Sequence, residues 1–331
     1  MLGEAKIVVK EQRSLQSSLT TTESAGANRL SDGREPKVAI VVLNWNGKRD
    51  TVECLASLNE IDYSNYEILL VDNGSTDGSQ KYFRAQYPEI ELIENEMNLG
   101  FAEGNNVGIR HAMNGRADYV LLLNNDTFVH PKFLSELVRV AEGGSRIGFV
   151  GPKIYYQEWR GQRDVIAFAG GCVNLWIGKA RNIGEGEKDR GQYEDTKQVN
   201  YLQGSCLMVK REVTQRIGLL DSTFFAYWEE TDWCVRGHRA GFKSVFVPEA
   251  KIWHKVEASS GGARSTYYKT RNLFWFMKKH ATGKQFLCFT LYFFFVQFWI
   301  SSGKIIVGTH SGDLLRSFLK GVRDGVRNHN G

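Results

Sequence analysis

Residues 38–47 read VAIVVLNWNG, an unbroken apolar run that stops at Asn44 and continues into a polar turn with a glycine. Runs of this length that are rich in Val and Ile are typical of strands buried on both faces of a parallel sheet. Two similar runs follow, EILLV at 67–71 and YVLLL at 119–123, and each also ends in Asn or Asp. The sequence therefore predicts these three segments as central strands of one sheet.

The segments between these strands have the pattern of helices. Apolar residues recur at helical spacing over 51–58, and helices are also predicted at 78–86 and 98–113, with a short strand at 90–93. Alternating strands and helices imply right-handed crossovers and a parallel sheet, whose ligand site lies at the carboxyl ends of its strands. Polar residues stand at those ends, namely Asn44, Asp72 and Asp126.

The composition is that of a globular protein. Of the 331 residues, 42% are hydrophobic and 24% charged, which argues against a disordered chain and against a polytopic membrane protein. A net charge of +5 is too small an excess to indicate nucleic-acid binding. The five cysteines are widely spaced and include no Cys-x-x-Cys pair, so we expect reduced thiols in an intracellular protein without a zinc site.

The chain is predicted to have three parts. Residues 1–35 are polar and show almost no apolar period, which predicts a flexible tail. In the central part, the range 148–255 is richer in Gly and aromatic residues, and we expect a loop at 182–197 and a strand at 201–210. Beyond residue 265 the sequence becomes aromatic and basic, which indicates a third part.

Two common nucleotide-binding motifs are absent from the sequence. The first strand is followed by Asn44-Trp45-Asn46-Gly47 instead of Gly-x-Gly-x-x-Gly, and no Gly-x-x-x-x-Gly-Lys-Ser/Thr run occurs. These absences disfavour a dehydrogenase or an NTPase. Side chains must then hold any nucleotide, and we expect Trp45 near its base and Asp72 on a base or ribose edge.

The segment Asn124-Asn125-Asp126 directly follows the third strand. A carboxylate at a strand end is well placed to bind Mg²⁺ or Mn²⁺, because these ions prefer oxygen ligands and can bridge two phosphates. Asn and Asp are also common in turns, so an ordinary turn is the alternative.

Residues 227–233 read YWEETDW and bring three carboxylates together, those of Glu229, Glu230 and Asp232. Crowded, partly buried carboxylates raise one another's pKa values, which suits a general base that works near neutral pH. The alternative is a helix N-terminus that collects acids because of its dipole. His254 follows an apolar strand, a position that by itself is more typical of a core or surface histidine than of a ligand.

Together these segments resemble a known family. Six ordered motifs between Lys37 and Arg271 are similar to those of inverting nucleotide-sugar glycosyltransferases of the GT-A fold, family 2, in the bacterial rhamnosyltransferase-like branch. The motifs are VVLNWNG (41–47), VDNGSTDGS (71–79), NLGFAEGNN (98–106), LLLNNDT (121–127), WEETDWCVR (228–236) and WH (253–254).

The resemblance implies an α/β fold with a Rossmann-like, mostly parallel central sheet and helices on both faces. It implies a catalytic domain at 36–265, with a nucleotide-binding half at 36–130 and an acceptor-binding half at 131–265. A C-terminal aromatic helical extension at 266–331 completes the expected organisation.

The resemblance also implies roles for individual residues. Asp126, at the last position of the family's Asp-x-Asp motif, and His254 are expected to bind the metal, Mg²⁺ or Mn²⁺. Glu230 stands where the family has its catalytic base, with Glu229 and Asp232 as alternatives. The residues expected to bind the nucleotide sugar are Asn44, Trp45, Asn46, Asp72, Asn73, Gly74, Ser75, Asn98, Gly100, Phe101, Gly104, Asn105, Asn124, Asn125 and Arg264.

The implied reaction is a single displacement that inverts the anomeric centre. The metal, backbone N–H groups and Arg264 neutralise the departing diphosphate, while the base takes a proton from the attacking hydroxyl. We expect a nucleoside-diphosphate sugar, with rhamnose as a candidate, and a cell-surface glycan or lipid-linked acceptor. The alternatives are a non-catalytic nucleotide-sugar-binding subunit of a membrane assembly and a sugar-phosphate nucleotidyltransferase; a homo-oligomer stays open.

Residues 285–303 carry no charged side chain and eight aromatic ones. As a helix, this segment is about 28 Å long, only marginally enough to cross a bilayer core. Lysines flank it at 278, 279, 284 and 304, so we expect peripheral contact with the cytoplasmic leaflet and a location at the inner face of the cell membrane. Packing against the catalytic domain or a second subunit, and a true span, are the alternatives.

Overall fold

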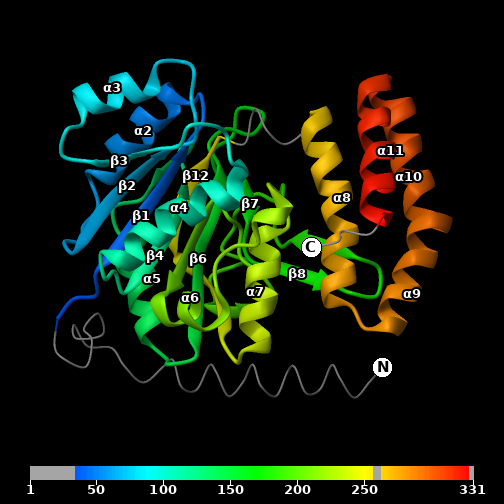
Figure 1. The fold of residues 1–331 in the computed structure, drawn as a ribbon. Coiled ribbons are helices and arrows are strands. Elements are labelled where there is room, and N and C mark those ends of the chain that lie inside the picture. Colours follow the sequence, from blue (N-terminus) through cyan, green and yellow to red (C-terminus); the bar gives the residue numbers. More distant parts are fainter. Residues whose placement is uncertain (1–33, 256–261, 328–331) are drawn as a thin grey trace.

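The structure, a computed structural model, describes residues 34–255 and 262–327. The tail predicted at 1–35 lies outside the described residues except for its last two positions. A ten-stranded sheet crosses the molecule (Figure 1) in the order β10-β12-β6-β11-β4-β1-β2-β3, with β5 beside β12 and β7 beside β6. Its strands are β1 (Val38–Asn44), β2 (Tyr66–Asp72), β3 (Glu91–Glu94), β4 (Tyr119–Asn124), β5 (Thr127–Val129), β6 (Ile147–Tyr156), β7 (Ile166–Phe168), β10 (Lys197–Val199), β11 (Cys206–Lys210) and β12 (Lys243–His254).

Helices cover both faces of this sheet (Figure 1). They are α2 (Lys48–Leu58), α3 (Ser79–Gln86), α4 (Gly100–Asn114), α5 (Phe133–Glu142), α6 (Arg211–Ile217) and α7 (Glu229–Arg239). From β1 the chain moves toward one edge of the sheet, with α2 leading to β2 and α3 to β3. It then returns past β1 to β4 through α4. Because the crossovers are right-handed, α4 lies on the face opposite to α2 and α3. Because β1, β2, β3 and β4 pair in parallel and β6 pairs in parallel with β12, the predicted fold class is confirmed.

The register of the strands aligns their polar ends. Asn44 lies beside Asp72 in the pairing of β1 with β2, and Leu43 lies beside Asn124 in the pairing of β1 with β4. Parallel strands end at the same edge of the sheet, so the polar residues that follow β1, β2 and β4 meet there, as the sequence predicts.

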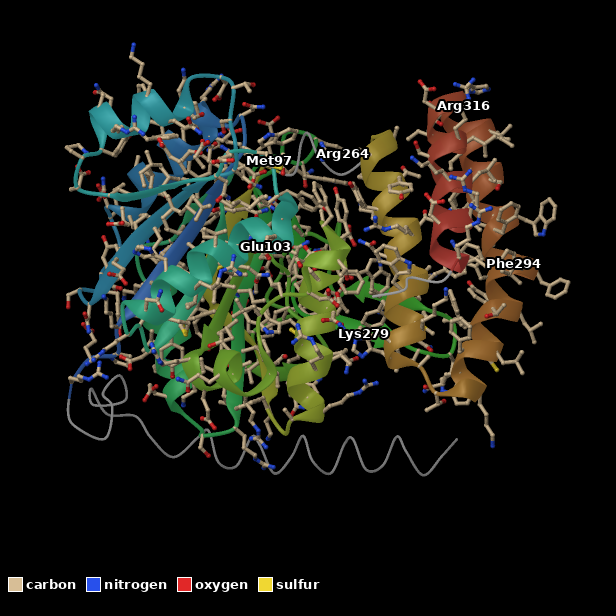
Figure 2. The ribbon with its side chains drawn as sticks, viewed as in Figure 1. Met97, Glu103, Arg264, Lys279, Phe294 and Arg316 are labelled. Carbon is tan, nitrogen blue, oxygen red and sulfur yellow. The ribbon has the colours of Figure 1, made fainter. Side chains whose placement is uncertain are left out.

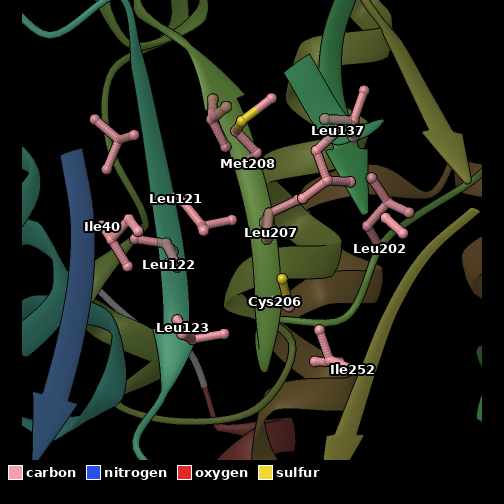
Figure 3. Close-up of a cluster of buried hydrophobic side chains, with 14 of the residues drawn as sticks. Ile40, Leu121, Leu122, Leu123, Leu137, Leu202, Cys206, Leu207, Met208 and Ile252 are labelled. Atoms are coloured by element: carbon pink, nitrogen blue, oxygen red, sulfur yellow. The ribbon is translucent and has the colours of Figure 1, made fainter. Parts of the chain in front are cut away.

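β1 shows no alternation of apolar and polar residues because both of its faces are buried in the core. Its residues 38–42 are all fully buried, because helices cover both faces of the sheet. Figure 3 shows Ile40 of β1 in one apolar cluster with Leu121 of β4 and Cys206 of β11. Burying one such aliphatic side chain stabilises a fold by about 1.5–3 kcal/mol.

The strand predicted at 201–210 is shorter in the structure. β11 begins at Cys206, whereas Tyr201 makes only an isolated bridge with Gly171. The backbone N–H of Cys206 donates to the carbonyl of Gln203 at 3.2 Å, which closes a turn just before the strand. The predicted range at 90–93 and the start of the helix predicted at 98 differ from β3 and α4 by only one or two residues.

The C-terminal part is a group of helices beside the sheet (Figure 1). It contains α8 (Ala263–His280), α9 (Gly283–Tyr292), α10 (Phe298–Gly303) and α11 (Gly312–Val326), with π-helical turns at Phe293–Gln297 and Lys304–Thr309. From Gly283 to Thr309 these elements form one continuous helix. The domain boundary expected at 265 therefore falls in the first turn of α8.

A small hairpin from the central part packs against the C-terminal helices. β8 (Gly171–Asn174) and β9 (Lys179–Asn182) are antiparallel, and their turn lies against α8 and α9. Gly178 in this turn has φ +61°, and a Cβ there would lie 2.5 Å from the ring of Phe289 and 3.1 Å from Leu273. Only glycine fits this left-handed, tightly packed position.

Candidate active site

The ends of β1 and β2 are locked together by buried polar side chains. Nδ2 of Asn44 donates to Oδ2 of Asp72 at 2.7 Å, and Oδ1 of Asp72 accepts from the Ser75 N–H and from Gln80, each at 2.9 Å. Asn44 and Asp72 are fully buried, so their groups are already engaged within the protein. They shape the loops at this edge of the sheet, and their direct contact with a nucleotide stays a prediction.

The loop before α4 is held in a similar way by Asn73. Its Nδ2 donates to Oδ1 of Asn98 and to the carbonyl of Gly100, and its Oδ1 accepts from the Leu99 N–H, all at 3.1 Å. Gly104 packs on this amide, where a Cβ would lie 2.9 Å from Nδ2 of Asn73. The structure thus brings the expected sugar-nucleotide residues at 73 and 98–104 together at the start of α4.

Trp45 and Arg264 meet at the exposed rim of this edge. Trp45 is 47% exposed, and the guanidinium of Arg264 lies 5.4 Å from its ring and 5.2 Å from the ring of Phe225. Figure 2 shows Arg264 at the upper end of α8. A cation between two aromatic faces is stabilised by their quadrupoles, so α8 supplies a positive charge to the strand ends although it follows them by more than 130 residues.

Asp126 and His254 converge as metal ligands would. Oδ1 of Asp126 and Nε2 of His254 are 2.9 Å apart, yet Oδ1 is buried and accepts no hydrogen bond. Two ligand atoms bound at right angles to one Mg²⁺ would be separated by about 3 Å. Nδ2 of Asn124 lies 3.4 Å from the same nitrogen. Burial acts to raise the pKa of Asp126, but the neighbouring His254 outweighs it and the pKa is lowered, so the carboxylate stays charged.

The pair has the donor atoms that a divalent cation needs but does not complete a metal centre alone. Among residues 34–255 and 262–327, no group of three His, Cys, Asp or Glu side chains is placed to hold an ion. Mg²⁺ commonly takes only one or two protein carboxylates and completes its shell with water and substrate phosphates. Asp126 and His254 therefore fit an ion that a diphosphate helps to hold.

Glu229 and Glu230 are neighbours in the first turn of α7; Glu229 is buried and Glu230 is partly buried. One carboxylate oxygen of each has no hydrogen-bond partner within the protein. Burial raises the pKa of Glu230 to about 7, and burial together with the charge of Glu230 raises the pKa of Glu229 well above its usual value. Such carboxyl groups can accept a proton near neutral pH.

Asp232 has a different environment, although it lies in the same turn of α7. Its carboxylate accepts from Arg236 and bonds with His280, each at 2.7 Å, and pairs with Lys279 at 2.8 Å. Burial opposes its charge, but these partners outweigh burial and lower the pKa to about 2. Asp232 is thus engaged in holding α7 against α8, which leaves the two glutamates as the open carboxyl groups.

The turn at 203–205 lies between the metal pair and the glutamates. The N–H of Asn124 donates to the carbonyl of Ser205 at 2.9 Å, which joins this turn to the end of β4. A Cβ on Gly204 would lie 3.2 Å from the ring of Phe101 and 3.7 Å from Cβ of Glu230. The turn therefore connects the end of β4, the start of α4 and the start of α7 in one site.

The sequence did not point to Asn272, which holds the loop before Glu229. Phe225, Tyr227 and Trp228 have φ values of +66°, +70° and +80°, and such conformations cost of order 1–3 kcal/mol each in non-glycine residues. Nδ2 of Asn272, fully buried in α8, donates to the carbonyls of Phe224, Ala226 and Tyr227 at 2.8–2.9 Å. A single asparagine in an aromatic, basic helix gives no sequence signal of this role.

We expect Asn272→Ala to lower kcat more than the affinity for the donor. The substitution removes the side-chain donor from the carbonyls of Ala226 and Tyr227 and frees the strained loop that aims Glu230, at a cost of about 1–3 kcal/mol in stability. Melting temperature and steady-state kinetics check this expectation. Thr270→Ser on the same helix retains its hydroxyl and is the matched control; equal loss of kcat in both variants would contradict the specific role of Asn272.

The chain is similar in sequence to a family model and to several known proteins. A model described as Glycosyl transferase family 2 matches residues 39–218. The chain is 30% identical over 221 residues to N-acetylglucosaminyl-diphospho-decaprenol L-rhamnosyltransferase of Mycobacterium tuberculosis, covering 62% of this chain and 72% of that protein. It is 23% identical over 250 residues to dTDP-rhamnosyl transferase RfbF of Shigella flexneri, covering 72% and 79%.

A solved structure with a similar fold is mannosyltransferase PcManGT from Pyrobaculum calidifontis, in complex with GDP-Man and Mn²⁺. It matches with a TM-score of 0.56 at 16% identity, covering 95% of this chain and 81% of that one. At this identity the likeness shows the fold.

Proposed function

The chain belongs to glycosyl transferase family 2 and is a glycosyltransferase, and from this premise we propose that it is an inverting, divalent-metal-dependent enzyme. Its donor is a nucleoside-diphosphate sugar, with rhamnose the first candidate because two relatives are named for rhamnosyl transfer. Its acceptor is a hydroxyl group of a glycan or of a lipid-linked precursor. The neighbouring carboxyl groups of Glu229 and Glu230, each with one buried oxygen that has no partner, are the observation on which the proposal rests.

Glu230 is the base in this proposal. Its carboxyl group has a pKa raised to about 7 by burial, so it is partly ionised at neutral pH and can accept the proton of an attacking hydroxyl. The attack displaces the diphosphate in one step, with one new C–O bond formed as the old one breaks, and this inverts the anomeric centre. A double displacement would need a carboxylate nucleophile on the face of the sugar opposite the leaving group; Asp232 is engaged with cations, and Glu229 adjoins the proposed base.

Asp126 and His254 would hold Mg²⁺ or Mn²⁺, which when bound neutralises charge on the leaving diphosphate. Arg264 at the rim adds a positive charge beside the strand ends. Trp45, exposed beside Arg264, offers a flat apolar surface for the nucleotide base. In this proposal residues 36–130 bind the nucleotide and 131–265 the acceptor, while His254 and Arg264 reach the diphosphate from the second half.

The first test is calorimetric titration of the protein with UDP, dTDP and GDP, each in Mn²⁺ and then in EDTA. We expect metal-dependent binding of one nucleotide, dTDP before the others, and transfer of the corresponding sugar to a hydroxyl acceptor with inversion detected by NMR. Binding without any turnover on a panel of polyprenyl-linked and free glycans would favour the non-catalytic binding subunit. Nucleotide synthesis from a sugar phosphate and a nucleoside triphosphate would favour the nucleotidyltransferase.

A further inference from the structure

The continuous helix Gly283–Thr309 exposes an apolar outer face. This face holds nine of the sixteen large apolar side chains that are exposed among the described residues: Leu287, Leu291, Phe294, Phe295, Val296, Trp299, Ile300, Ile306 and Val307. Phe295 is 76% exposed and Trp299 66%, and Figure 2 labels Phe294 on this helix, at the outer side of the C-terminal helices. Contiguous apolar patches of this kind mark interaction sites.

The inner face of the same helix is occupied. The ring of Phe274 in α8 lies 5.4 Å from Phe289 and 4.7 Å from Phe293, and Phe298 lies 5.6 Å from Phe318 in α11. Packing within the protein therefore accounts for one side of the apolar segment only. The helix is long and apolar enough to cross a membrane, and just 11% of its most apolar window is buried.

The charges around the outer face are mainly positive. Residues 283–327 contain six Lys and Arg and two Asp. Lys284 and Lys304 lie on the helix itself, and Arg316 and Lys320 are exposed on α11. Such an arrangement attracts an anionic surface, with each basic residue adding to the attraction, whereas a second copy of this face would meet like charges.

A span is disfavoured by the helices packed along the inner face. If Gly283–Thr309 crossed a bilayer, α11 would have to enter the hydrocarbon beside it, together with exposed Arg316, Lys320 and Arg323. Charged side chains in that position are strongly unfavourable. A helix that lies along the surface instead buries its apolar face in the headgroup boundary and leaves these charges in water.

We propose that the outer face of Gly283–Thr309 docks peripherally on a bilayer that contains anionic phospholipid. Phe295 and Trp299 enter the headgroup boundary, where Trp is favoured, and Lys284 and Lys304 on the same helix contact lipid phosphates. Since α8 packs on this helix and carries Arg264 and Asn272, docking holds the active site close to the membrane surface. The proposal concerns binding alone and does not depend on the transfer reaction.

The test is flotation of the full-length protein with vesicles of phosphatidylcholine, with and without phosphatidylglycerol. We expect the anionic vesicles to bind roughly tenfold more tightly or better, and the double variant Phe295→Ser/Trp299→Ser to lose on the order of tenfold in binding or more. Met97→Ser, at a side chain that is equally exposed at 65% but lies before α4, is the matched control and should bind as the wild type. Because both substituted aromatics are exposed, the melting temperature should change little.

Three results would overturn the proposal. The first is a double variant that floats like the wild type. The second is a wild-type dimer in light scattering that the double variant converts to a monomer while neither form binds vesicles, which assigns the face to a second copy. The third is protein that alkaline carbonate fails to release from cell membranes, which indicates a span.

Discussion

Glu230→Gln is expected to abolish most turnover while the donor still binds. Glutamine keeps the size and polarity of the side chain but cannot accept a proton, and loss of a general base costs roughly 10²–10⁴-fold in rate. Steady-state kinetics give kcat, and calorimetric titration with nucleotide and Mn²⁺ gives donor affinity. Glu230 is placed on the acceptor side of the proposed reaction. The substitution should therefore change the affinity for the donor only slightly.

The pH profile provides a second readout of the same substitution. A base must be ionised to work, so wild-type kcat/KM should fall as pH falls below the raised pKa of about 7, and this limb should be absent from the residual activity of Glu230→Gln. The raised pKa also has a cost, because the unfolded chain ionises more easily once pH exceeds the ordinary value of 4.5. The variant should therefore melt at the same or a higher temperature than the wild type at pH 8, with the difference lost below about pH 4.5.

Glu229→Gln is the matched control, since both glutamates lie at the start of α7 and both have a raised pKa. If Glu229→Gln loses turnover and Glu230→Gln retains it, the base is Glu229. Asp232→Asn should behave differently from both, because it leaves Arg236, His280 and Lys279 without their buried counter-charge. That variant is expected to lose stability as well as activity.

The sequence predicted the strand ends well because their signal is local. Apolar runs that stop at Asn44, Asp72 and Asn124 mark buried parallel strands, and the register then brings them to one edge without further information. The family predicted from the six motifs and the α/β fold are confirmed by the comparisons. The roles of individual site residues stay predictions.

Features that depend on contacts distant in the chain could not be predicted. Asp232 looked equivalent to Glu229 and Glu230, since its partners Lys279 and His280 follow it by almost fifty residues. Asn272 acts on carbonyl groups, which have no sequence signature. The segment 285–303 has no charged side chain that would mark a polar side, and only the packing of α8 and α11 separates its inner from its outer face.

Asp126→Ala is expected to remove the effect of Mn²⁺ on nucleotide binding. The pair with His254 offers two protein ligands, so removing one should weaken the metal-dependent part of binding on the order of a hundredfold. Thermal shift measures the same effect without turnover, because a ligand that binds the folded state raises its melting temperature. Mn²⁺ with nucleotide should stabilise the wild type and the control Asp62→Ala, an exposed carboxylate, but leave Asp126→Ala almost unshifted.

This comparison separates a metal site from a purely structural ion pair. If Asp126 served only to pair with His254, Asp126→Ala would lower the melting temperature without metal and leave the shift by Mn²⁺ and nucleotide intact. A metal site predicts instead that the shift by Mn²⁺ and nucleotide is lost, whether or not loss of the ion pair with His254 also lowers the melting temperature without metal. His254→Ala should then reproduce the loss of the shift, because an ion that needs both ligands is not retained by Asp126 alone.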